Sequence, residues 1–166
     1  YYFGTKSRLY SSQLEKLVLS TEREGAIADK AKAYALNIPQ RVYLSVYVLV
    51  HLQIRGYDPE FHKIVAWEIA GGREQLRHIS EKYFIPRIEN FERLIETGIA
   101  EGIFDCRNPL LLVWTLISQV VFYLMQHDTY INTKLYPRLY GEISSDDFLE
   151  FALELTFRGL SPAGNP

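Results

Sequence analysis

Apolar positions recur along the chain at spacings of three and four residues, and no segment alternates between apolar and polar positions in the way a half-buried strand does. Spacings of three and four place side chains on one face of an α-helix. A stripe of leucines follows Thr5, which predicts a helix from there to about Leu36. The whole pattern predicts an all-α fold of about six helices packed as a bundle.

Helix start and stop signals divide the next part of the chain. Pro39 and Gly56 bound a second helix, and its middle, residues 42–50, is apolar nearly all round. A helix of this kind belongs at the centre of a bundle. Asp58 followed by Pro59 predicts the next start, because Asp caps a helix N-terminus and Pro suits the first helical position.

Glycine and proline then interrupt the pattern. Gly71 and Gly72 weaken the third helix midway, and Pro86 marks a kink or a new start. From Ile88 the spacing predicts a fourth helix that closes around Gly102.

The last third of the chain holds two more predicted helices. Asn108-Pro109 opens the first, whose apolar run, residues 110–125, is sixteen residues long. A membrane span needs about 20 apolar residues, so we expect this helix to be buried in protein. Residues 130–141 suggest a looser connection, and the acidic start at residues 144–147 predicts a final helix that ends near Leu160.

The two last helices, residues 108–129 and 145–160, are each apolar over more than one face. A helix that packs only on its own domain needs a single stripe, so the surplus face predicts a partner, and two-fold pairing is the commonest solution. We therefore expect a homodimer built on a four-helix bundle. Its predicted interface contains Ser118, Val121, Phe122, Met125, Phe148, Phe151, Ala152 and Leu155.

Composition narrows the class of protein. Hydrophobic residues make up 48% of the chain, enough for a core, and the formal net charge is -2. The one cysteine, Cys106, cannot form a disulfide within the chain, which suits a reducing compartment. No secretory signal opens the chain. We expect a cytoplasmic chain that does not enter a membrane.

Signatures of catalysis are missing from the sequence. No histidine has a histidine partner four residues away, and none follows a glutamate by three residues, so the common zinc and di-iron helix motifs are absent. Nucleophile elbows and phosphate-binding glycine loops are absent too. The sequence therefore predicts no enzyme, no cofactor and no metal site.

Aromatic residues, at 14%, suggest a binding pocket instead. Tyr43, Tyr47 and His51 lie one turn apart on the central helix. Aromatic walls with a few polar tips suit a mostly apolar ligand, whereas the alternative is that these rings are ordinary core. The predicted ligand-binding residues are Tyr43, Tyr47, His51, Trp67, Phe91, Ile95 and Trp114.

Three stretches resemble the TetR family of transcriptional regulators. The opening Tyr-Tyr-Phe-Gly-Thr-Lys, followed by Leu9 and Tyr10, resembles the end of that family's recognition helix and the start of the next helix. Residues 95–104, followed by Asn108-Pro109, are similar to the family's junction between its seventh and eighth helices. The closing residues 153–160 are similar to its last helix.

This resemblance implies a homodimeric, ligand-responsive repressor with a TetR-like ligand-binding domain at residues 9–166. Residues 1–8 would be the remnant of a helix-turn-helix DNA-binding domain, with Tyr1, Tyr2 and Lys6 at positions that meet operator DNA in the full-length protein. The family often has acidic residues after the lysine, where this chain has Ser7 and Arg8. The alternatives are a helical carrier of small apolar molecules with no DNA role, and a bundle enzyme.

Overall fold

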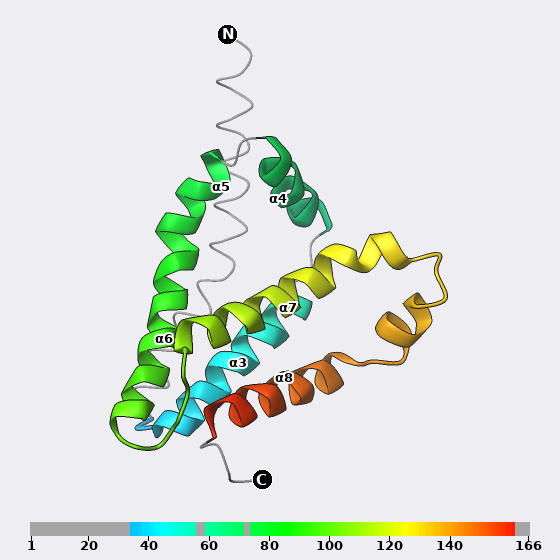
Figure 1. Ribbon diagram of the computed structural model, residues 1–166. Coiled ribbons are helices and arrows are strands. Elements are labelled where there is room, and N and C mark those ends of the chain that lie inside the picture. Colours follow the sequence, from blue (N-terminus) through cyan, green and yellow to red (C-terminus); the bar gives the residue numbers. More distant parts are fainter. Residues whose placement is uncertain (1–33, 56–58, 72–73, 162–166) are drawn as a thin grey trace.

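The computed structural model describes residues 34–55, 59–71 and 74–161, and all regular structure within these ranges is helical (Figure 1). The expected all-α fold is therefore confirmed. The DNA contacts expected of Tyr1, Tyr2 and Lys6 and the boundary after residue 8 lie outside the described residues. The helix expected from Thr5 to about Leu36 lies outside them too, except for its end: residues 34–36 are described and are not helical, and Ala35 has a φ of +52°. The described α-helices are α3 (Ile38–Arg55), α4 (Pro59–Gly71), α5 (Glu74–Ile79), α6 (Ile85–Ala100), α7 (Pro109–Tyr130) and α8 (Ser145–Leu160), and two π-helical segments are η1 (Ser80–Phe84) and η2 (Pro137–Gly141).

Helix α3 forms the centre of the bundle, as its apolar middle predicts. It packs against α6, α7 and α8. Its valines at Val42, Val46 and Val50 follow each other at four-residue spacing and are fully buried. Burial of a valine side chain contributes about 1.5–3 kcal/mol each, so this stripe is a large part of the core.

Helices α5 and α6 are joined by η1 into one continuous rod (Figure 1). Pro86 lies in the first turn of α6 and has no N–H to donate to the fourth residue before it. The backbone N–H of Ile85 reaches five residues back to the oxygen of Ser80, which is the π-helical pattern. Pro86 therefore marks a local widening of the helix rather than a break in the rod.

The chain turns sharply after α6. Gly102 has a φ of +72°, a left-handed conformation that glycine adopts without strain. The backbone N–H groups of Ile103 and Phe104 both donate to the oxygen of Gly98, at 2.8 and 3.2 Å. This turn places the Phe104 side chain in the core.

Local hydrogen bonds begin the two last helices where the sequence predicts. The Asn108 side chain accepts from the backbone N–H of Leu111 at 2.9 Å and caps α7. At α8, Ser144 Oγ accepts from the N–H of Asp147, and the Asp147 carboxylate accepts from the N–H of Ser144 at 2.8 Å. The two helices run antiparallel and pack against each other (Figure 1).

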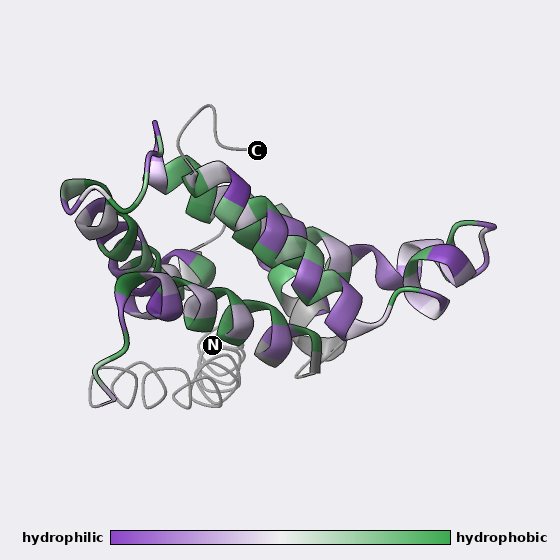
Figure 2. Cartoon of the chain, turned by 90° about the horizontal axis from the view of Figure 1, so that it is seen from below, coloured by the Kyte–Doolittle hydropathy of each residue, from purple (hydrophilic) through white to green (hydrophobic). Residues whose placement is uncertain are grey.

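Helix α7 is much less buried than we expected. Val113, Leu116, Val120 and Leu124 form its buried stripe, whereas only 22% of its most apolar window lies inside the chain. Apolar and polar residues are mixed over the visible helix surfaces (Figure 2). Among the described helices, α7 alone is long and apolar enough to cross a membrane, with 22 residues and a hydropathy of 1.6, a property that core helices share.

Candidate functional site

The seven residues expected to line one pocket occupy three different environments: the packed core, the edge of the core and the exposed surface. Phe91 and Ile95 belong to the packed core, and Ile95 is 0% exposed. Trp67 and Trp114 lie on the surface, at 65% and 56% exposed. In the described part of the chain these residues therefore do not enclose a common cavity, and the single pocket proposed from the sequence is not formed there.

The rotation of α3 explains this difference. Residues 42, 46 and 50 point into the bundle, and residues 43, 47 and 51 follow each of them by one position, about 100° further round the helix. Tyr43 is therefore half exposed, and Tyr47 and His51 lie at the edge of the core. An apolar helix with a tyrosine stripe does not by itself show which stripe faces inward.

His51 is the exception among these residues, because it has an unsatisfied polar atom. Its ring stacks on Tyr47 with a centroid distance of 4.7 Å and an interplanar angle of 17°. Its Nδ1 is buried and has no hydrogen-bond partner among the described residues. A buried polar atom without a partner costs about 1–3 kcal/mol, which a ligand with a hydrogen-bonding group would recover.

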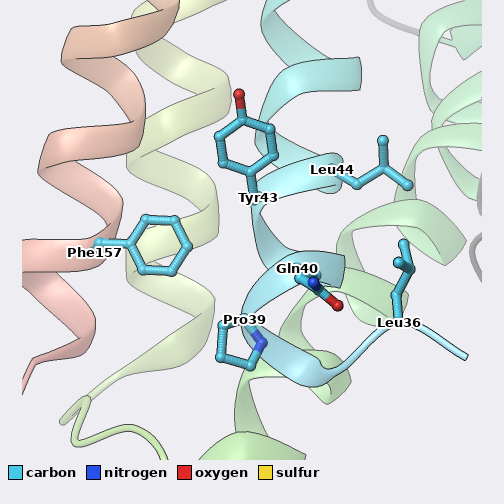
Figure 3. A pocket seen from close by; sticks show the side chains of 6 residues that line it. All are labelled: Leu36, Pro39, Gln40, Tyr43, Leu44 and Phe157. Carbon is cyan, nitrogen blue, oxygen red and sulfur yellow. The ribbon is translucent and has the colours of Figure 1, made fainter.

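A first surface hollow, of about 440 Å³, lies between the start of α3 and the end of α8 (Figure 3). The Phe157 ring of α8 faces it from one side, and Tyr43 of α3 is the only one of the seven expected residues that borders it. Its wall is almost wholly apolar, with polar tips from Tyr43 and Gln40. The full lining is Leu36, Pro39, Gln40, Tyr43, Leu44 and Phe157.

A second hollow, of about 550 Å³, lies between α6 and the start of α7. Trp114 borders it, so the structure places Tyr43 and Trp114 at two separate hollows. The remaining lining comes from aliphatic side chains, two glutamates and one asparagine, namely Ile85, Ile88, Glu89, Glu92, Asn108, Leu110 and Leu111. The sequence analysis did not identify the glutamates, because surface acids on a helix carry no local signal for a ligand.

The residues expected at a dimer interface are mostly accessible. Phe122 and Phe151 are 62% and 56% exposed, and Val121 and Ser118 are exposed too. Met125, Phe148 and Leu155 are half-buried. Ala152 differs from the expectation: it is 2% exposed and packs in the core of its own chain, where a partner cannot reach it.

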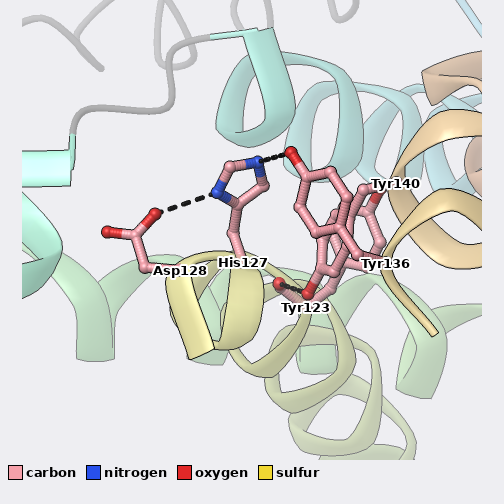
Figure 4. Close-up of polar contacts among 5 residues, drawn as sticks. All are labelled: Tyr123, His127, Asp128, Tyr136 and Tyr140. Atoms are coloured by element: carbon pink, nitrogen blue, oxygen red, sulfur yellow. Dashed lines mark hydrogen bonds and ion pairs between the residues drawn. The ribbon is translucent and has the colours of Figure 1, made fainter. Parts of the chain in front are cut away.

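A polar and aromatic cluster joins the end of α7 to η2 (Figure 4). His127 Nδ1 lies 3.0 Å from Asp128 Oδ1, and His127 Nε2 lies 3.0 Å from Tyr136 Oη. With a neutral ring, Nδ1–H donates to the carboxylate and Nε2 accepts from the tyrosine hydroxyl. Tyr140 Oη donates to the backbone oxygen of Tyr123 at 2.7 Å.

Ring packing accompanies these hydrogen bonds. The rings of Tyr123 and Tyr140 lie 4.7 Å apart, and those of His127 and Tyr140 lie 5.0 Å apart. Burial raises the pKa of the Tyr123 hydroxyl above its usual value, and neighbouring Tyr136 adds to the effect. Neither hollow borders these residues. The cluster therefore fastens η2 to α7, and the sequence analysis missed it because its partners are nine and seventeen residues apart.

The described residues offer surfaces and hollows for binding. Within the described ranges, no three His, Cys, Asp or Glu side chains gather closely enough to hold a metal ion. Cys106 is a half-buried free thiol. The chain matches no protein-family model, no curated protein and no solved structure.

Proposed function

We propose that this chain is the dimerising, effector-binding part of a TetR-like transcriptional regulator that acts as a repressor. The observation that carries the proposal is the antiparallel pair α7 and α8, because both helices expose large apolar side chains in addition to those that they bury in the core of the described residues. Phenylalanine side chains left in water at this density mark an interaction surface. The resemblance of residues 1–6 to the end of a recognition helix supports a role on DNA.

In the proposed mechanism, pairing of α7 and α8 with a second copy sets the distance between two DNA-binding heads. An effector shifts this distance by binding one dimer geometry more tightly than the other, and a coupling of about 1–3 kcal/mol is typical. The unsatisfied Nδ1 of His51 and the apolar hollow beside Tyr43 supply the kinds of contact an effector uses. This regulator needs no catalytic group.

Chromatin immunoprecipitation of the protein, expressed from its own gene with a C-terminal tag, tests the DNA role. We expect a small set of enriched sites with a palindromic motif, because a two-fold dimer reads two half-sites. An effector found by thermal shift should then release the protein from these sites. A genome with no enriched site would contradict the proposal.

The second candidate function is a carrier of small apolar molecules. The almost wholly apolar wall of the hollow between α3 and α8 favours it. A carrier and a regulator give opposite results in the same immunoprecipitation, because a carrier leaves no enriched DNA. Both candidates predict that an apolar ligand at 100 times its dissociation constant adds about 2.7 kcal/mol of stability.

A further inference from the structure

The hollow between α6 and α7 combines an apolar floor with an aromatic wall. Ile85 and Ile88 border it from the first turns of α6, and Leu110 and Leu111 border it from the first turn of α7. The Trp114 side chain, more than half exposed, completes the wall. Its volume of about 550 Å³ falls within the range of about 300–1,000 Å³ that small-molecule sites occupy.

The charges at this hollow are negative and unpaired. Glu89 and Glu92 lie three residues apart on α6 and both border the hollow, which no lysine or arginine lines. Neither carboxylate forms an ion pair or a side-chain hydrogen bond with any described residue. Arg93, which follows Glu92 in the sequence, donates instead to the backbone oxygen of Glu89 and the side chain of Asn90, and Arg87, two residues before Glu89, is not part of the lining.

The positive end of the α7 helix dipole offsets only part of this negative charge. A helix N-terminus carries about half an elementary positive charge, and the Asn108 side chain already accepts one of the free N–H groups there. Two carboxylates outweigh that half charge. The hollow therefore attracts a positive group, and an exposed indole face binds a positive group better than any other aromatic side chain does.

The helix that supplies the glutamates is irregular just before the hollow. The π-helical segment η1 ends at Phe84, and the next residue, Ile85, already lines the hollow. A π-helical turn contains one extra residue, so it rotates every side chain that follows it, and such turns are frequent at functional sites. Ile88, Glu89 and Glu92 follow this segment within eight residues and lie on the side of α6 that borders the hollow.

We propose that this hollow is a binding site for a small organic cation with an apolar body, such as an aryl-substituted quaternary ammonium ion. Trp114 and the aliphatic side chains hold the body and the positive charge lies toward Glu89 and Glu92. This inference does not depend on a role in transcription, because a carrier or a regulator could use the same site.

Three probes of the same size and different charge test the proposal: phenyltrimethylammonium, its neutral isostere tert-butylbenzene, and benzenesulfonate. Titrations follow tryptophan fluorescence in the full chain carrying Trp67→Phe, which leaves Trp114 as the one tryptophan. We expect the cation to bind most tightly and the anion least. Only the affinity of the cation should fall as salt is added, because the carboxylates are accessible to ions.

Two variants and one control assign the binding to this hollow. In Glu89→Gln with Glu92→Gln, the Kd of the cation should rise roughly threefold to tenfold, as expected for partly exposed ion pairs, and that of the neutral probe should stay unchanged. Binding to the Trp114→Leu variant is measured by saturation-transfer NMR. This change should weaken binding of the cation more than binding of the neutral probe. Glu96→Gln is the matched control, an exposed acid on α6 that does not line the hollow.

Three outcomes would overturn the proposal. The first is equal affinity for the cation and the neutral probe. The second is a cation affinity that survives the double glutamine change. The third is loss of cation binding as the protein concentration rises, because this result would assign the hollow to a second copy of the chain.

Discussion

At the scale of single residues, Gly98 shows how a missing side chain shapes the end of α6. A Cβ atom at this position would lie 2.3 Å from Phe104 Cδ2 and 3.1 Å from Ile38 Cγ2. Both neighbours are buried, so neither can move away without opening the core. The close approach allows Phe104 to cover the point where α3 and α6 meet.

Gly98→Ala should therefore lower the free energy of unfolding by about 1–3 kcal/mol, the usual cost of overpacking. Urea unfolding at a fixed protein concentration measures the change. Gly71→Ala is the matched control, because a Cβ atom there meets nothing within 4 Å. We expect it to change stability by less than about 0.5 kcal/mol, and equal effects of the two variants would refute this packing argument.

Asp147 gives a prediction about pH. Hydrogen bonds from the Ser144 side chain and then from its backbone N–H lower the pKa of the Asp147 carboxyl. A lowered folded-state pKa stabilises the protein above the unfolded value of about 3.9, and this contribution is lost as pH falls through the folded value. Asp147→Asn should lower Tm at pH 7. It should also make Tm decrease less steeply as the pH is lowered.

The control for this prediction is Asp146→Asn, which removes a charge from the same turn and leaves the capping box intact. Melting curves of both variants at several pH values compare them. If the two variants had the same acid profile, the capping box would not be the cause of the Asp147 pKa.

At the scale of elements, segments that the sequence predicts as separate are joined in the structure. Helices α5 and α6 become one rod through η1, and η2 gives helical form to part of the connection predicted to be loose at residues 130–141. The rings of Tyr123, Tyr136 and Tyr140 pack together there. This packing, with the hydrogen bonds of Figure 4, makes η2 an extension of the bundle.

Tyr140→Phe should loosen this extension, because it removes the hydrogen bond to the backbone oxygen of Tyr123. A hydrogen bond of this kind contributes about 0.5–1.5 kcal/mol. Hydrogen exchange should become faster in residues 136–141 and stay unchanged in α3. Tyr130→Phe is the control, since the Tyr130 hydroxyl has no hydrogen-bond partner in the described chain; faster exchange in α3 as well would mean that η2 is not a separate unit.

At the scale of the whole molecule, the exposed apolar side chains of α7 and α8 predict a homodimer. Burying them in a four-helix interface would remove roughly 2,000 Å² or more from water, the size of an obligate interface. We expect light scattering to give the mass of two chains at micromolar concentration. Phe122→Asp and Phe151→Asp should each shift the protein to single chains, because a carboxylate would be buried without a partner.

Ile131→Asp is the control for these changes, an exposed aliphatic residue just after α7 and outside the expected interface. It should leave the mass unchanged. A wild-type chain that stays single at micromolar concentration would refute the dimer. A dimer that tolerates both aspartates would place the interface elsewhere.

The sequence predicted the helix ends better than the site. Asn108 and Ser144 start their helices in the structure as they do in the pattern, because a cap acts on a backbone N–H three residues away. The aromatic pocket was not predictable in the same way. Whether Tyr43 or Val42 points inward depends on the rotation of α3, which is set by side chains of α6, α7 and α8.

The sequence by itself therefore determined the all-α class, the starts of α3, α4, α7 and α8, and the surplus of apolar surface on α7 and α8. These properties come from interactions within four residues and from the period of the pattern. Only the tertiary structure decided that Ile95 lies in the core, that Ala152 is out of reach of a partner, and that Glu89 lies beside a hollow with Trp114. Contacts between residues far apart in the chain set these positions, and no local signal encodes them.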